Sequence, residues 1–185
     1  MGIRQGAGAP CLPGVSSACA GGGRGRKMNL SPDVLKTVQE AALDAGLPIS
    51  IVAGIVCQES SGWTNRKPRY EPGFFQRYIL KIPGLGTEER KGRATSWGPM
   101  QVMGQTAREM GYTAPFQNML VLEIGLYWGC RHLKRLKTRY FAEYGWEGVL
   151  AAYNAGSPRK RNGRYVNQSY VDGVMWYASQ ATGGR

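Results

Sequence analysis

Glu59 is a carboxylate at the end of an apolar segment, residues 52–63, which read VAGIVCQESSGW. Ile51, Ile55 and Glu59 recur every four residues, so a helix through this segment places the carboxylate in line with a buried stripe. Apolar neighbours and the partial negative charge of a helix C-terminus both disfavour the charged form of a carboxyl. The sequence therefore predicts a raised pKa for Glu59, which a general acid working near neutral pH needs.

The elements around Glu59 are predicted to be mostly helical. A first helix is expected after its capping residue Ser31, and it stops at Gly46. The helix that carries Glu59 follows, and residues 61–96 then form an irregular lobe, broken by Pro and Gly, that is expected to carry at most a small hairpin. Later helices are expected from Pro99 to Gly111, about Asn118 to Tyr144, Trp146 to Ala155 and Val166 to Ala181, with a loop bearing Arg159, Lys160, Arg161 and Arg164 before the last.

The expected fold class is mostly α, of the α+β type. It is a single helical domain, over residues 29–182, with a small irregular or β-hairpin lobe inserted after the second helix. Residues 1–28 are rich in Gly and Arg and are predicted to be a flexible basic tail, and residues 183–185 a short C-terminal tail.

The charge balance is strongly basic. Lys and Arg number 24 against 12 Asp and Glu, a formal net charge of +12. Such a surface favours nucleic acid, anionic lipid or the anionic polymers of a bacterial envelope, and charge alone does not choose among them. No apolar run is long enough to predict a membrane span, and the N-terminus lacks the continuous apolar stretch of a secretory signal.

Cysteine and histidine usage argues against several site classes. The four cysteines are widely spread and lack CxxC spacing, so neither a disulfide scaffold nor a zinc site is predicted. Cys57 and Cys130 are interpreted as small core residues, with a bridge between them left open. His132 is the single histidine and is expected at the surface. The absence of other histidines argues against nucleophiles activated by histidine. No metal or cofactor is predicted.

Three segments stand in a fixed order: QESSG at 58–62, SWGPMQ at 96–101 and AYNAG at 152–156. Together they resemble the soluble lytic transglycosylase (SLT) domain family, and the resemblance covers roughly residues 31 to 180. It implies a lysozyme-like fold. Two features depart from the family pattern: the link from Thr64 to Thr95 is long, and Pro99 replaces the usual Leu before Met100. The segment RYEP at 69–72 is similar to stretches in phage-encoded members.

The resemblance implies cleavage of the β-1,4 bond between N-acetylmuramic acid (MurNAc) and N-acetylglucosamine (GlcNAc) in peptidoglycan. Glu59 would protonate the leaving oxygen and then remove the proton of the muramic-acid C6 hydroxyl, which closes onto C1 as a 1,6-anhydro end. The N-acetyl group of the substrate can shield the cation, so no second carboxylate is required.

The same resemblance implies a set of substrate-binding residues. Gln101 can hydrogen-bond the catalytic carboxyl or an acetamido group, and Tyr153 can orient Glu59 or stabilise developing charge. Asn154 can hold a backbone turn or bind a sugar, and Ser60 can instead cap its helix end. The full set is Ser60, Ser96, Gly98, Met100, Gln101, Tyr153 and Asn154.

Glu71 is the candidate second carboxylate. It follows Glu59 by twelve positions, in the irregular lobe, where a lysozyme-type muramidase would keep a carboxylate to activate water. The alternative for Glu71 is an ion pair with Arg69 or Arg77 that holds the lobe together.

A hypothesis from another class also stands: a catalytically silent, basic glycan-binding or virion structural protein. The expected partners are peptidoglycan strands and the proteins of a phage particle or envelope machine, with no specific nucleic acid, because the basic residues concentrate in the tail and two loops. The expected place of action is the bacterial periplasm or cell wall, reached by virion association or release through a phage or secretion machine.

Overall fold

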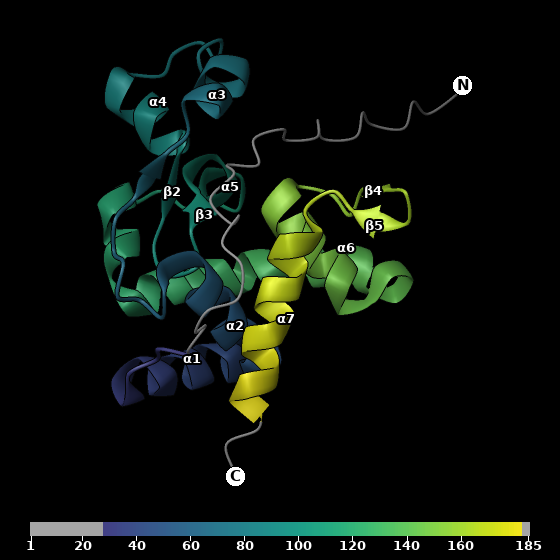
Figure 1. Cartoon of the computed structure of the whole chain (residues 1–185). Coiled ribbons are helices and arrows are strands. Elements are labelled where there is room, and N and C mark those ends of the chain that lie inside the picture. The colour runs from purple at the N-terminus through teal and green to yellow at the C-terminus, as the bar shows by residue number, and fades with distance from the viewer. Residues whose placement is uncertain (1–27, 183–185) are drawn as a thin grey trace, which may run out of the picture.

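The computed structural model describes residues 28–182, and the expected tails, 1–28 and 183–185, lie outside these described residues except for Met28. The chain forms a mostly helical body with a small sheet-bearing lobe (Figure 1). The elements are α1 (Pro32–Ala45), α2 (Ile49–Ser60), β1 (Arg69–Tyr70), α3 (Pro72–Phe74), the π-helix η1 (Phe75–Ile79), α4 (Thr87–Arg93), β2 (Thr95–Trp97), β3 (Val102–Met103), α5 (Gly104–Glu109), the 3-10 helix η2 (Phe116–Leu120), α6 (Leu122–Ala155), β4 (Lys160–Arg161), β5 (Arg164–Tyr165) and α7 (Gln168–Thr182).

The first two helices follow their local signals, as predicted. The Ser31 side chain accepts a hydrogen bond from the Val34 amide at 3.4 Å and caps α1. Gly46 ends α1 in the left-handed conformation, with φ of 66°. The chain then turns directly into α2, which ends by presenting Glu59.

Helix α2 is the centre of the core. It is apolar nearly all round and is buried from Ile51 to Cys57. Helix α7 lies across it, so close that a Cβ on Gly54 would meet the Val174 carbonyl oxygen at 2.7 Å (Figure 1). This crossing brings the N-terminal half of α7 to the end of α2 where Glu59 stands.

The inserted lobe is built on a three-stranded antiparallel sheet of order β1-β2-β3. Arg69 pairs with Ser96, and Ser96 pairs with Met103. The elements α3, η1 and α4 lie between β1 and β2 and form the top of the lobe (Figure 1). The predicted lobe after the second helix is therefore confirmed.

The helix expected from Pro99 is wrong at its start. Residues 98–101 form a turn, β3 follows, and α5 begins only at Gly104. Gly98 has φ of 75° and Gln101 φ of 48°, neither of which is helical. Strand pairing of Trp97 with Val102 fixes this turn and overrides the helix preference of a first-turn proline.

The later helices differ from the expectation mainly at their boundaries. The two helices expected on either side of Gly145 form the single element α6, bent at Gly145, whose φ of 59° and ψ of −164° are not helical. The segment expected as a basic loop is instead the two-stranded hairpin β4-β5.

Two further expectations concern the core and the membrane. Cys57 and Cys130 are both buried and free, which confirms them as core residues and excludes a bridge between them. Among the helices of residues 28–182, none combines the length and the apolar character needed to cross a membrane.

Candidate active site

Glu59 lies in the last turn of α2, just before Ser61, which caps the helix with φ of 51°. Desolvation by burial raises the pKa of Glu59 to about 7, while a hydrogen bond from Tyr170 and the positive charge of Arg69 act in the opposite direction. Part of the side chain remains accessible to solvent. The carboxyl can therefore hold a proton near neutral pH and still reach a bound molecule.

Tyr170 is the direct partner of this carboxyl. Its hydroxyl donates to Glu59 Oε1 at 2.8 Å from α7, 111 positions along the chain. Burial and the charge of Glu59 raise the pKa of Tyr170 well above 10, so it remains a hydrogen-bond donor. Sequence reasoning missed this residue. The sequence did contain a signal for it. Tyr170, Val174 and Ala178 recur every four residues and form the buried face of α7, which therefore begins with a tyrosine.

Ser60 acts within the protein. Its side chain is buried, and its Oγ lies 2.9 Å from the carbonyl oxygens of Val56 and Pro99, either of which can accept its single proton. The same oxygen accepts the Trp63 amide proton at 3.1 Å. These bonds tie the end of α2 to the turn after β2, so Ser60 positions the helix end rather than facing solvent.

The turn of residues 98–101 is packed tightly against the body. A Cβ on Gly98 would meet the Met119 carbonyl oxygen at 2.5 Å, so the turn requires glycine for space as well as for its positive φ. Met100 is fully buried. Gln101 is partly exposed, and its Nε2 donates to the Gly98 carbonyl oxygen at 3.0 Å, which leaves its Oε1 available to a ligand.

Tyr153 and Asn154 come from the last turns of α6. The Tyr153 hydroxyl donates to the Met100 carbonyl oxygen at 2.8 Å and thus holds the 98–101 turn, while the charge of Glu59 contributes to its raised pKa. Asn154 is exposed, and its Oδ1 accepts from Asn167 Nδ2 at 2.9 Å. Tyr153 is therefore near Glu59, but the hydrogen bond to its carboxyl comes from α7.

His132 is half-buried, so the surface position expected for it is only partly correct. Its Nδ1 is buried without a hydrogen-bond partner, and its ring packs against Tyr153 with centroids 5.1 Å apart. Burial lowers the pKa of His132 to about 4, so the ring is neutral at physiological pH. The residue belongs to the packing behind Tyr153, on the inner side of α6.

One face of the small sheet completes the site. Arg69, Ser96 and Met103 stand opposite one another across β1, β2 and β3, so they share a face. Ser96 is buried, whereas half of the Arg69 side chain is exposed. Arg69 is the second residue that sequence reasoning missed as part of the surroundings of Glu59.

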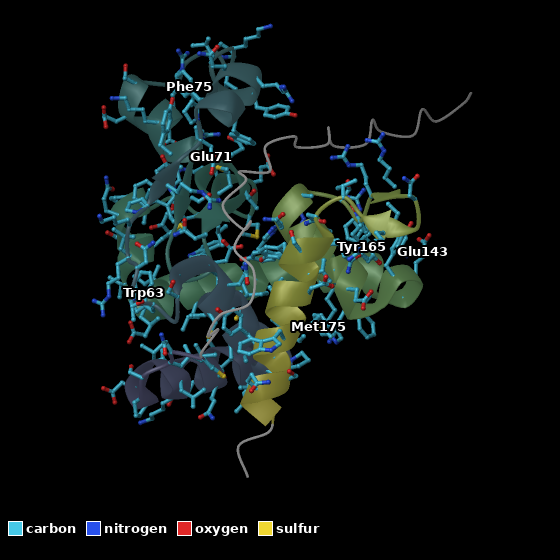
Figure 2. All side chains as sticks on the ribbon, viewed as in Figure 1. Trp63, Glu71, Phe75, Glu143, Tyr165 and Met175 are labelled. Carbon is cyan, nitrogen blue, oxygen red and sulfur yellow. The ribbon has the colours of Figure 1, made fainter. Side chains whose placement is uncertain are left out.

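Glu71 lies two residues beyond Arg69, where the strand opens into the lobe (Figure 2). Arg69 Nε donates to Glu71 Oε1 at 2.6 Å, which is the ion pair considered as the alternative role of this carboxylate. Arg69 thus acts electrostatically on both Glu59 and Glu71. No group of three metal-ligating side chains occurs within residues 28–182.

The fold and these surroundings define a lysozyme-like, mostly helical domain in which a carboxyl at the end of α2 is hydrogen-bonded from α7, and side-chain bonds from α2 and α6 hold the 98–101 turn. Residues 36–171 match the family described as the transglycosylase SLT domain, and the chain belongs to this family. No match is found among curated proteins.

The fold is also similar to the crystal structure of an inactive mutant of the lytic transglycosylase Slt from Pseudomonas aeruginosa. The two share 21% sequence identity with a TM-score of 0.51, over 81% of this chain. The chain corresponds to only 24% of that longer protein, so the similarity concerns the fold.

Proposed function

We propose that the protein is a peptidoglycan lytic transglycosylase that cleaves the β-1,4 bond between MurNAc and GlcNAc, with Glu59 as general acid and then general base. The observation that carries this proposal is the pKa of about 7 at Glu59, in a chain that belongs to the SLT domain family. Such a carboxyl is divided between its acid and base forms at neutral pH, which suits a group that performs both steps.

In the first step the Glu59 carboxyl gives its proton to the bridging oxygen as the bond from that oxygen to C1 of MurNAc breaks. In the second step the Glu59 carboxylate takes the proton of the MurNAc C6 hydroxyl while that oxygen bonds to C1. The products are a free GlcNAc 4-hydroxyl and a 1,6-anhydroMurNAc end, and no water is consumed. The N-acetyl group of the substrate shields the cation between the steps.

Other residues support the carboxyl or the sugar. Tyr170, which donates to Glu59 at 2.8 Å, stabilises the carboxylate formed after the first step. Gln101 offers its Oε1 to an acetamido N–H, and the exposed Asn154 is the second proposed sugar-binding amide. Ser60, Gly98 and Met100 shape the site from within the protein.

A muramidase that hydrolyses the same bond is the second candidate, because Glu71 directly follows the strand that carries Arg69. The ion pair with Arg69 Nε favours ring closure, since it engages the Glu71 carboxylate that would activate water. Hydrolysis requires this carboxylate to be free to accept the proton of the attacking water.

Analysis of the products by mass tests the proposal. Purified glycan strands digested with the protein should yield 1,6-anhydroMurNAc ends, which are lighter than hydrolysed ends by one water. The Glu59→Gln variant should bind the strands and release nothing, while the surface variant Glu40→Gln should cleave normally, because Glu40 is exposed on α1. Reducing ends in place of anhydro ends would assign the protein as a muramidase, and full activity of Glu59→Gln would exclude Glu59 as the acid.

Because peptidoglycan is the proposed substrate, the periplasm and cell wall of bacteria are the proposed place of action. Delivery by a phage particle or an envelope machine is the accompanying hypothesis. Binding to isolated cell walls without any product, by the unmodified protein, would instead support the silent binding module.

A further inference from the structure

The hairpin β4-β5 is a rigid, strongly basic element. Its strands pair Lys160 with Tyr165 and Arg161 with Arg164. The two residues between them, Asn162 and Gly163, have φ of 53° and 78°, as a tight two-residue hairpin turn requires. The geometry of the backbone therefore fixes which residues stand opposite each other across the hairpin.

The positive charges of this hairpin are only partly neutralised by the described residues. Arg159, Lys160, Arg161 and Arg164 are all exposed. Arg164 lies 3.8 Å from Asp172, and Lys160 lies over the Tyr165 ring at 4.7 Å. No carboxylate within residues 28–182 forms an ion pair with Arg159 or Arg161.

The pairing of Arg161 with Arg164 places like charges directly opposite each other, which disfavours folding of the hairpin. Both side chains are exposed, and Asp172 offsets the charge of Arg164 alone, at 3.8 Å. Arg161 thus keeps a charge that opposes folding and has no carboxylate partner within residues 28–182, which is expected where a ligand supplies the opposite charge.

The hairpin is anchored to the surroundings of Glu59. At its base, Asn167 donates to the Ala151 carbonyl oxygen at 3.1 Å and to Asn154 Oδ1 at 2.9 Å. Tyr165 is buried, and its hydroxyl oxygen lies 3.2 Å from the point where a Cβ on Gly148 of α6 would stand. Helix α7 starts three residues after β5 and carries Tyr170 to Glu59. The basic hairpin is thus joined to the helix that contacts Glu59 and, through Asn167, to Asn154.

We propose that the hairpin β4-β5 binds the carboxylates of the acidic stem peptides attached to the glycan, and so makes the protein prefer peptide-bearing strands. This inference rests on the proposed function for its substrate. A stem peptide leaves the glycan at the lactyl group of MurNAc, the sugar on which Glu59 is proposed to act. A strand held at Glu59 therefore presents its carboxylates at the border of the site, where Arg159 and Arg161 lack a partner.

The test compares glycan strands with stem peptides intact and strands from which an amidase has removed them. The wild-type protein should cleave the peptide-bearing strands with the higher kcat/KM. The variant Arg159→Gln/Arg161→Gln should lose about fivefold of this preference at low ionic strength, the size expected for two exposed ion pairs. The charge-matched control Lys36→Gln/Lys134→Gln, which removes exposed residues of α1 and α6, should keep the preference. Salt at about 0.15 M should weaken it, since the Debye length is then about 8 Å and the attraction between exposed charges is screened.

Binding is measured separately in the Glu59→Gln background, so that the hairpin is tested even if no strand is cleaved. Absence of cleavage by the wild type would refute the proposed function, whereas a binding preference for peptide-bearing strands that depends on Arg159 and Arg161 would still support the hairpin. Equal effects on both kinds of strand, or equal effects of the control variant, would overturn the inference. The hairpin variant should melt at or above the wild-type temperature, because it removes a like-charged pair.

Discussion

Replacing Glu59 with Gln is expected to stabilise the folded protein above neutral pH. Burial raises the pKa of Glu59 from its ordinary value of 4.5 to about 7. Between these two pH values the folded state binds more protons than the unfolded state, so the free energy of unfolding falls as the pH rises. The penalty is absent below about pH 4.5 and complete above about pH 7.

The size of this penalty follows from the two pKa values. They differ by about 2.5, and each pKa unit corresponds to about 1.36 kcal/mol, which gives a ceiling of about 3.4 kcal/mol. Because the side chain keeps some contact with solvent, a penalty of about 2 to 3 kcal/mol is expected. The amide introduced by Glu59→Gln is neutral at every pH and escapes this penalty. A gain of about 2 kcal/mol corresponds to a rise in melting temperature of roughly 4 to 8 °C for a domain of this size.

Thermal unfolding of the wild type, Glu59→Gln and the surface control Glu40→Gln should be followed at about pH 5 and about pH 8, on either side of the raised pKa of Glu59. The Glu59→Gln variant should melt higher than the wild type at the alkaline pH and close to it at the acidic pH, while Glu40→Gln should change little at either. An equal gain at both pH values, or none at the alkaline one, would show that the surroundings of Glu59 do not oppose its charge. The proposed acid would then lack its physical basis.

Three further outcomes are expected. The Tyr170→Phe variant lacks the hydroxyl that donates to the Glu59 carboxylate, so the pKa of Glu59 should rise further. The alkaline limb of the pH profile of kcat/KM should then move up by about half to one pH unit. An unmoved limb would contradict the role of this hydrogen bond. Gly98→Ala should lower the free energy of unfolding by about 2 kcal/mol or more in denaturant titration, because its Cβ would meet a carbonyl oxygen at 2.5 Å with φ of 75°. Burial raises the thiol pKa of Cys57 to about 11 and of Cys130 to about 12. In a variant in which Cys11 and Cys19 are replaced by Ser, a thiol reagent should therefore label the protein only after unfolding.

The parts of the fold that were predictable depend on local signals. Ser31 and Gly46 bound α1 because a side-chain cap and a left-handed glycine act within one helical turn. The turn at 98–101 was mispredicted because its conformation depends on the pairing of Trp97 with Val102 and on contact with the distant Met119. The sequence Asn162-Gly163 did contain the turn signal of a hairpin, but strands of two residues carry too short an alternation to reveal it.

The same difference between local and long-range signals applies to the residues of the site. Glu59 could be found because its motif and its helix are contiguous, so an apolar stripe and a carboxylate appear together in the sequence. Tyr170 lies 111 positions away and reaches the carboxyl only through the crossing of α7 over α2. Tyr153 was expected to orient Glu59 or to stabilise developing charge, and its hydroxyl donates to the Met100 carbonyl oxygen. Tertiary packing decides whether Tyr153 or Tyr170 hydrogen-bonds the Glu59 carboxyl. Residue type and spacing in the sequence do not reveal this packing.

The two features that the proposals depend on each work against folding. Glu59 is held where its charged form is disfavoured, and Arg161 faces Arg164 across a two-residue hairpin. The two are connected through Tyr170, Asn167 and Asn154. A substrate with carboxylates near the cleaved bond is complementary to the charge that the hairpin leaves unpaired, and the Glu59→Gln variant keeps this hairpin. Peptide-bearing strands should therefore raise the melting temperature of the Glu59→Gln variant more than strands without peptides.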